Sequence, residues 1–285
     1  MLNMRQPDPD WIVGKHALLN IHAKLRNGRT EIDPHAWRIP YQWQGYHYQD
    51  HDDQPFLLLI NSGGGFVEGD ASEFNGLLDP GTRALVTTTA ASKYYKCLTG
   101  GRCIETVNFD VGAGAVLEYL PDEAIPFARS RSQRKTVIEL AQTSRLFATD
   151  MISAGRIHYG AGEAFMFSEM QSEFSISIEG RTVASDRLLL ASLEEVDELK
   201  ELWGGAHHMA TVYCYGADWP AGTERAIEAL GNGGRVVIGA SRIAGLIVVR
   251  ILTQETWEAQ ETVFSVWKII RPLICDKPAR PISKC

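Results

Sequence analysis

The chain has 285 residues, of which 45% are hydrophobic and 22% charged, and its formal net charge at pH 7 is −7. This composition excludes a disordered chain, and a chain of this length buries about three quarters of its unfolded surface in one large or two modest domains. The acidic balance disfavours nucleic acid, whose phosphates need a basic face, and suits metal ions or a basic protein surface.

Short strands and turns are predicted for the first two thirds of the chain. Apolar residues alternate over residues 19–25, which predicts a strand, and Asn27-Gly28 predicts the turn that follows it. A buried strand at 56–60 leads to a glycine-rich turn. Further strands are predicted at 84–89, 107–111, 134–140 and 174–178. The regular spacing of these strands predicts an all-β body over about residues 15–190, without a repeat period that would indicate a regular solenoid.

The last third changes character. Helices are predicted at 193–203, with Ser192 as the cap, at 220–230, and from Thr253 to Pro272. Strands are predicted at 211–215, 235–239 and 246–252. These elements indicate a small α+β layer at about 191–275, attached to the β body, with a tail at 276–285. We therefore expect a single domain over residues 1–285.

Targeting and membrane segments are not expected. The first eleven residues lack the apolar core of a signal peptide. The longest apolar runs, 56–60 and 244–249, are far shorter than the roughly 20 residues of a membrane helix. The five cysteines are scattered without C-x-x-C spacing, which argues against structural zinc and a disulfide framework. A cytoplasmic protein fits these observations.

The glycine-rich segment 61–70, NSGGGFVEGD, allows two interpretations. A phosphate cradle needs glycines followed by Lys-Ser/Thr and a helix, and both are missing, so a P-loop is excluded. The alternative is a tight turn with positive φ in which Asp70 accepts hydrogen bonds from backbone amides. That turn is compatible with Asp70 also lining a polar passage.

Other clusters give weaker signals. The loop from His47 to Asp53 contains two histidines and three aspartates, which suits either weak binding of a divalent cation or a solvated acidic loop. Neighbouring basic residues could lower the pKa of Cys97 and Cys103, although inert thiols are the default. Gly233-Gly234 precede a strand, the wrong order for a dinucleotide site, and no G-x-S-x-G motif is present. The sequence therefore contains no catalytic constellation.

Seven segments, taken together and in order, resemble the urease accessory protein UreD (UreH) family between about residues 15 and 275. The segments are INSGGGFVEGD, TRALVTTTAASKYYK, LEYLPDEAIPFARSRSQRKTVIEL, ATDMISAGRIHYGAGEAF, EGRTVASDRLLL, GASRIAGLIVVRIL and VWKIIRPLI. Glu68 replaces a glycine that is usual in the family, which adds a charge that could alter metal contacts at the turn. The ending RPISKC also departs from the pattern of relatives.

The resemblance implies a mainly β fold, a helical stack of β-sheets, with few helices and no enzymatic activity. It implies binding to apo-urease and to UreF, which recruits the GTPase UreG, and no permanently bound cofactor. It also implies transient passage of nickel through a water-filled interior. Weak oxygen ligands suit such a passage. The candidate residues are Asp70, Glu73, Asp150 and Asp186, with Thr88, Ser92 and Lys93 nearby.

Two alternatives stay open at this point. One is a β-rich carbohydrate-active enzyme that uses acids such as Asp70 and Glu73. The other is a UreD-like scaffold that serves a different metalloenzyme.

Overall fold

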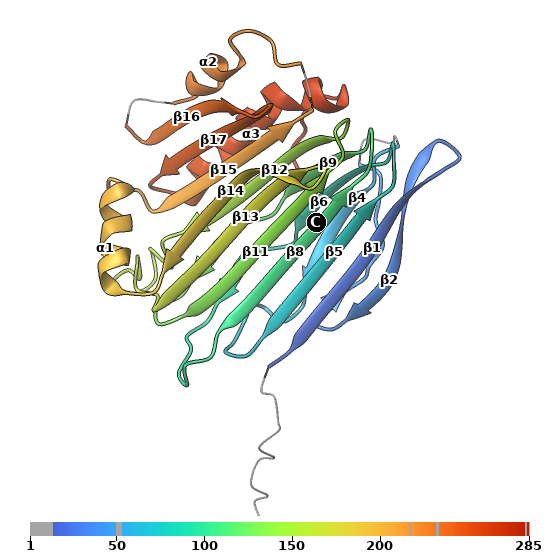
Figure 1. Cartoon of the computed structure of the whole chain (residues 1–285). Coiled ribbons are helices and arrows are strands. Elements are labelled where there is room, and N and C mark those ends of the chain that lie inside the picture. Colours follow the sequence, from blue (N-terminus) through green and yellow to red (C-terminus); the bar gives the residue numbers. More distant parts are fainter. Residues whose placement is uncertain (1–13, 50–52, 217, 232–233, 283, 285) are drawn as a thin grey trace, which may run out of the picture.

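Two β-sheets packed face to face form most of the protein in the computed structural model (Figure 1). The structure describes residues 14–49, 53–216, 218–231, 234–282 and 284. The first sheet has seven strands, in the order β14 (Arg181–Leu190), β13 (Glu169–Ile178), β11 (Arg131–Leu140), β8 (Cys103–Val111), β5 (Ala71–Leu78), β1 (His16–Arg26) and β2 (Arg29–Arg38).

The second sheet has ten strands. Eight follow one path, in the order β16 (Val236–Ile243), β17 (Leu246–Thr253), β15 (His208–Tyr215), β12 (Arg145–Ser153), β9 (Val116–Leu120), β6 (Arg83–Thr88), β4 (Phe56–Asn61) and β3 (Tyr41–Gln42). The short strands β7 (Ser92–Tyr94) and β10 (Ala124–Pro126) pair with each other, and β10 also pairs with β12.

From β4 to β13 the chain passes alternately between the sheets, apart from the short pair β7 and β10. Neighbouring strands in this part are parallel in both sheets, for example β5 with β8 and β6 with β9. The strand pairs at the ends are antiparallel, β1 with β2 and β13 with β14 in the seven-stranded sheet, and β3 with β4 and β16 with β17 in the ten-stranded sheet. A mainly β fold with mixed sheets is therefore confirmed, whereas the helical stack of sheets stays a prediction.

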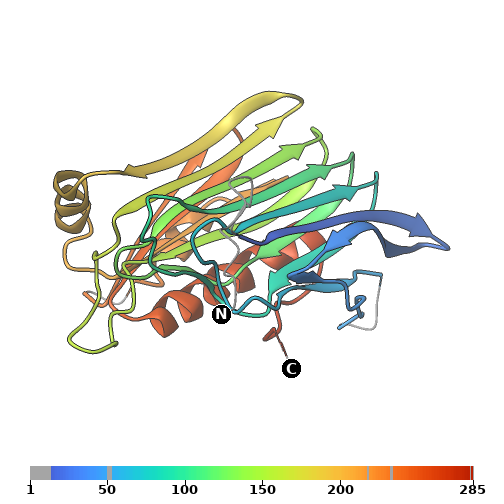
Figure 2. The same cartoon turned by 90° about the horizontal axis from the view of Figure 1, so that it is seen from below.

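Three helices lie among the described residues: α1 (Leu193–Leu202), α2 (Thr223–Glu228) and α3 (Thr256–Cys275). Figure 2 shows α3 beneath the ten-stranded sheet, on the side away from the seven-stranded sheet. The molecule therefore has three layers. Strands β15, β16 and β17, predicted as part of a small α+β end, continue the ten-stranded sheet. No described helix is long and apolar enough to cross a membrane.

The two ends of α3 differ from the prediction. Thr253 is the last residue of β17, and the helix begins after Glu255, which forms a capping box with Glu258. The helix also continues past Pro272 to Cys275. Proline removes one backbone donor and crowds the preceding turn, which usually ends a helix. Here it lies in the last turn, where the apolar face of α3 is still buried through Ile274.

Two apolar cores follow from the alternation of side chains along the strands of the ten-stranded sheet. On β12, Leu146 and Ala148 face the seven-stranded sheet and join the core between the sheets. Phe147 and Met151 face the other way and pack with α3. The second core contains Trp267, which is 1% exposed. One strand thus supplies both layers, which explains why its side chains are buried almost without interruption.

Candidate functional site

A polar row interrupts the apolar core between the two sheets. Glu105 on β8 pairs in register with Arg134 on β11, and Arg134 pairs in register with Ser172 on β13. Side chains alternate along each strand, so these three residues lie on the same face as the core residues Val107 and Phe174. That face meets the ten-stranded sheet, from which β12 contributes Asp150.

Charged hydrogen bonds join the two sheets at this row. Arg134 donates to Asp150 Oδ1 at 3.0 Å and to Ser172 Oγ at 3.3 Å. Its Nε lies 3.6 Å from Glu105 Oε2. Glu105 accepts hydrogen bonds from Ser92 at 2.9 Å and from the phenol of Tyr94. All six side chains are thus linked in one network.

Burial and charge shift the pKa values in this network. Burial opposes the charge on Arg134, but Asp150, Tyr94 and Glu105 together outweigh it and raise the pKa of the guanidinium. Burial, with a further contribution from Glu105, raises the pKa of the Tyr94 phenol. Arg134 therefore stays charged and Tyr94 stays neutral at physiological pH.

Two hollows flank the row. One, of about 80 Å³, lies at the glycine-rich turn and is lined by Thr88, Ser92, Lys93 and Glu105, together with Gly64 and Gly65. The other, of about 170 Å³, is lined by Asp150, Ser172, Asp186, Thr211 and Arg250. The predicted residues Thr88, Ser92 and Lys93 thus share one hollow, and Asp150 and Asp186 share the other.

Asp186 pairs with a second arginine at the edge of the larger hollow. Its carboxylate accepts from the guanidinium of Arg250 and from the phenol of Tyr213. Burial, followed by the bond to Asp186, raises the pKa of Tyr213. The side chains of Arg250 and Asp186 are 46% and 32% exposed, so solvent reaches this pair more easily than the pair of Arg134 and Asp150.

The structure places Asp70 and Glu73 away from the row. Asp70 is buried in the glycine-rich turn, where its carboxylate accepts the backbone amides of Lys15 at 2.7 Å and Val67 at 3.0 Å. This is the turn that the sequence offered as the alternative to a cradle. Glu73 is exposed on the outer face of the seven-stranded sheet, where its carboxylate accepts a hydrogen bond from the Asn75 side chain.

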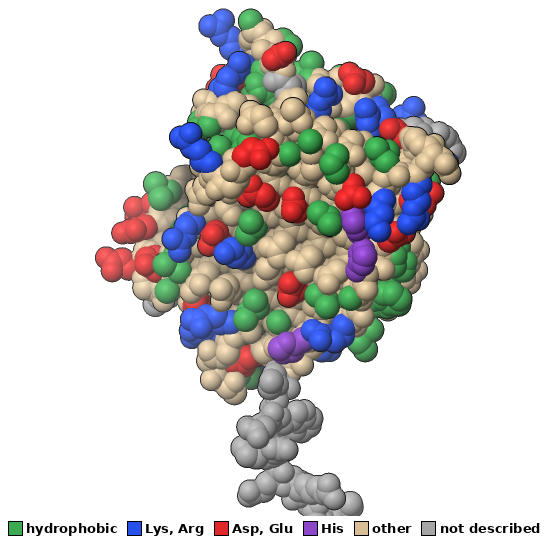
Figure 3. Space-filling view, turned by 45° about the vertical axis from the view of Figure 1, so that its right-hand side comes forward, with side chains coloured by type: hydrophobic (Ala, Val, Ile, Leu, Met, Phe, Trp, Pro, Cys, Tyr) green, Lys and Arg blue, Asp and Glu red, His purple; other side chains and the backbone are tan. Residues whose placement is uncertain are grey.

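Acidic and basic side chains are interspersed over the described residues of the face in Figure 3.

Glu68 does not point towards the row. Its carboxylate accepts the backbone amides of residues 98, 99 and 101, at 2.7 Å from Leu98 and 3.0 Å from Thr99. The bonds from Thr99 and Leu98 lower the pKa of Glu68 to about 2. The charge that this chain adds at the turn therefore holds the loop at residues 98–101. These contacts of Glu68 give no support to the prediction that its charge alters metal contacts at the turn.

Gly65 explains why the turn is rich in glycine. Its φ is +139°, and a Cβ added there would lie 2.6 Å from Tyr95 Cε2 and 2.8 Å from the carbonyl oxygen of Lys93. A side chain would therefore collide with strand β7, whose backbone carbonyl accepts from Phe66. The close approach of the turn to β7 forms one wall of the smaller hollow.

The other sequence candidates lie outside the row. Burial is the main cause that raises the pKa of Cys103, which agrees with the default expectation of an inert thiol at this residue. Residues 50–52 lie outside the described part of the chain, and Asp53 pairs with Lys277 at 3.1 Å. His208 is buried with its Nδ1 3.1 Å from Glu123. No group of three or more His, Cys, Asp or Glu side chains that could hold a metal ion occurs among the described residues.

Sequence reasoning missed Glu105 and Arg134. Glu105 lies one pair of residues before the alternating run 107–111 that predicted β8, whereas Arg134 is the first residue of the run 134–140 that predicted β11. Extending the first alternation by one pair, and following the second to its first residue, would have placed both side chains on the inner face. Arg134 lies within one of the segments that resemble the family, but nothing in that segment assigns it a role, so strand periodicity was the available signal for both residues.

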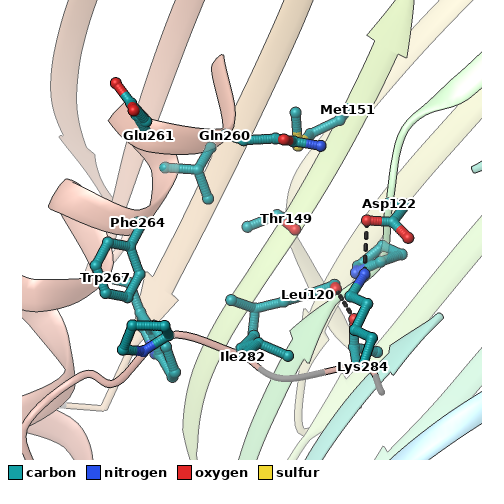
Figure 4. Close-up of a pocket in the computed structure, with 14 residues that line it drawn as sticks. Leu120, Asp122, Thr149, Met151, Gln260, Glu261, Phe264, Trp267, Ile282 and Lys284 are labelled. Atoms are coloured by element: carbon teal, nitrogen blue, oxygen red, sulfur yellow. Dashed lines mark hydrogen bonds and ion pairs between the residues drawn. The ribbon is translucent and has the colours of Figure 1, made fainter. Parts of the chain in front are cut away.

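A larger apolar groove lies on the far side of the ten-stranded sheet, beside α3, with a volume of about 560 Å³. Figure 4 shows Phe264 and Trp267 of α3 on one side, and Leu120 and Asp122 on the other. The C-terminal segment crosses it, with Lys284 Nζ 2.6 Å from Asp122 Oδ1. An apolar hollow of this size suits an apolar ligand or the side chains of a partner protein.

Comparison with known proteins agrees with the resemblance seen in the sequence. The family model described as UreD urease accessory protein matches residues 15–283. The urease accessory protein UreD of Dechloromonas aromatica is 27% identical, covering 98% of this chain and 96% of that protein. The UreD proteins of Pseudomonas fluorescens Pf-5 and Pseudomonas putida GB-1 are 28% and 30% identical, covering 96% and 79% of this chain. The chain therefore belongs to the UreD urease accessory protein family.

Proposed function

We propose that this chain is a non-catalytic scaffold of urease maturation in the cytoplasm, which passes nickel through the polar row between its two sheets. Membership of the UreD family supports a role in urease maturation. The observation that carries the finer proposal is the row itself, with a hollow at each end and with carboxylates and hydroxyls in both.

The chemistry of the row suits a cargo ion better than a resident one. Carboxylate and hydroxyl oxygens bind divalent cations, but a tight nickel site favours imidazole or thiolate ligands. Asp150 and Asp186 are each paired with an arginine, which weakens their attraction for a cation. A cation would thus meet weak ligands from which it can depart.

Partner binding is the second part of the proposal. In the proposed assembly this chain binds UreF, which brings UreG, and apo-urease receives the nickel. The apolar groove beside α3 and the extended sheet surfaces provide contact area for proteins. The groove is larger than either hollow of the row, which fits a protein whose main ligands are other proteins.

The test is urease maturation with and without this chain. We expect co-expression with UreF to give a stable complex, and deletion of this chain to leave urease with little nickel. Nickel per urease active site, measured by atomic emission, is the readout. Normal nickel content without this chain, together with no binding to UreF, would refute the proposal. Normal urease together with a different metalloenzyme that co-purifies and lacks metal after deletion would favour a UreD-like scaffold for that enzyme.

The carbohydrate-active alternative has less support. It relied on Asp70 and Glu73 acting together. Asp70 is engaged by two backbone amides inside a turn, and Glu73 faces outwards from the following strand. A glycosidase needs two carboxyl groups that flank one bond in a shared cleft. Glycan hydrolysis that is lost in Asp70→Ala would revive this alternative.

A further inference from the structure

A single arginine side chain lies between the two hollows. Glu105 lines the smaller hollow and Asp150 lines the larger one. Arg134 is close to both carboxylates, 3.6 Å from the first and 3.0 Å from the second. The side chains of all three are largely buried, with 11%, 14% and 12% of Arg134, Glu105 and Asp150 exposed. A cation held by Glu105 or by Asp150 would therefore lie next to this guanidinium.

The charges at this point do not cancel. One guanidinium faces two carboxylates, which leaves one formal negative charge in a poorly solvated region. Two carboxylates without the arginine would hold a divalent cation much more firmly, because little water is present to compete. Arginine cannot lose its proton, so its opposition to a cation does not depend on pH.

The contacts of Arg134 also suggest that it is able to move. Its Nε is buried without a hydrogen-bond partner among the described residues, although the other two nitrogens bond Ser172 and Asp150. A buried donor without an acceptor is costly and uncommon. A shift of the guanidinium towards Glu105 would satisfy this donor and release Asp150.

We propose that Arg134 is a movable plug, which separates the two hollows and prevents Glu105 and Asp150 from trapping the cation that passes. When the guanidinium moves to one carboxylate, the other is free to bind the cation and then to release it as the arginine returns. This inference rests on the proposed delivery function. The inference gives Arg134 control over release of the cation, a role that follows neither from family membership nor from the positions of the carboxylates.

The test measures nickel binding to the purified full-length chain by equilibrium dialysis, without urease. Arg134→Gln should gain one nickel ion per chain, bound at least about tenfold more tightly than any nickel on the unchanged protein. The double variant Arg134→Gln/Asp150→Asn should lose this gain. Arg134→Lys keeps the positive charge and should not gain nickel. An Arg134→Gln protein that is folded but binds no additional nickel would overturn the proposal, as would an equal gain in Arg134→Lys.

Arg134→Gln leaves two buried carboxylates without a counter-charge and could prevent folding, so a second variant is needed. If it does not fold, Glu105→Gln/Arg134→Gln removes one of these charges. This variant should still gain nickel relative to Glu105→Gln, and the gain should disappear when Asp150→Asn is added. No gain in this pair would also overturn the proposal.

Urease maturation distinguishes failure of the Arg134 plug from failure of nickel delivery by this chain. A nickel gain in Arg134→Gln, in cells whose urease matures without this chain, supports the plug and refutes delivery. Maturation that depends on this chain, together with no nickel gain in the folded variant, refutes the plug and leaves delivery intact. If both hold, Arg134→Gln should retain nickel and lower the nickel content of urease.

Discussion

Replacing Arg271 by methionine should strongly destabilise the protein, because this residue joins α3 to the ten-stranded sheet. Arg271 and Glu118 are 2% and 0% exposed. Arg271 Nε lies 3.1 and 3.2 Å from the two carboxylate oxygens of Glu118. The same carboxylate accepts Trp267 Nε1 at 2.6 Å and Gln54 Nε2 at 2.8 Å. Without the guanidinium, the buried carboxylate keeps two neutral donors and has no counter-charge among the residues that the structure describes.

The expected loss follows from that burial. Removing one partner of a buried ion pair costs about 3–5 kcal/mol of the free energy of unfolding. With a urea m-value of about 3 kcal/mol/M, the midpoint should fall by about 1–1.7 M. Urea denaturation followed by tryptophan fluorescence measures this shift, and Trp267 itself reports on the site.

Two control variants test whether the loss of stability comes from the unpaired buried charge. Arg26 pairs with Asp33 at 2.7 Å but is 47% exposed, so water screens this pair and Arg26→Met should barely lower the urea midpoint. Glu118→Leu combined with Arg271→Met removes both charges and should recover part of the loss. A midpoint for Arg271→Met no lower than that for Arg26→Met would refute the argument. So would a double variant less stable than Arg271→Met alone.

Three further predictions concern other parts of the fold. Phe147 is fully buried, so Phe147→Ala should lower the free energy of unfolding, measured by urea denaturation, by about 3–5 kcal/mol. Leu202 is 79% exposed, so Leu202→Ala should lower it by less than about 0.5 kcal/mol. Equal losses in the two variants would contradict this prediction. Glu68 has a lowered pKa in the folded state. Its ionised carboxylate should therefore hold the loop at residues 98–101 closed against hydrogen exchange fully above pH 4.5, and this protection should be lost as the pH falls through about 2. Hydrogen exchange of that loop should show this loss, and Glu68→Gln should abolish the dependence; an unchanged profile would count against it. Gly65→Ala should destabilise more than Gly64→Ala, since both have positive φ but only Gly65 lacks space for a Cβ; thermal melts that rank them in reverse would disprove the clash.

The sequence predicted most single elements. Period-two alternation located β1, β8, β11 and β13, and Asn27-Gly28 forms the turn after β1 with positive φ at both residues. Ser192 caps α1 in a capping box with Glu195, as the Ser-x-x-Glu pattern predicts. These features are local, because a strand face, a turn or a cap depends on residues only a few positions apart.

Local patterns failed where distant contacts decide the outcome. Pro272 does not end α3, because the buried apolar face of that helix continues to Ile274 and outweighs the local penalty. The strands of the predicted α+β end join the ten-stranded sheet, a pairing between residues far apart in the chain. Sequence periodicity cannot specify which strand becomes the neighbour of another.

The amino-acid sequence by itself determined the family, the mainly β character and the chemistry available along the strands. Only the tertiary structure decided which charges meet. It separated Asp70 and Glu73, which are close in sequence, because one closes a turn and the other faces outwards. It joined Glu105, Arg134 and Asp150, because strands β8 and β11 are neighbours in one sheet and β12 faces them from the other. A strand fixes the face on which each side chain lies, but the partners across that face come from the packing of the sheets.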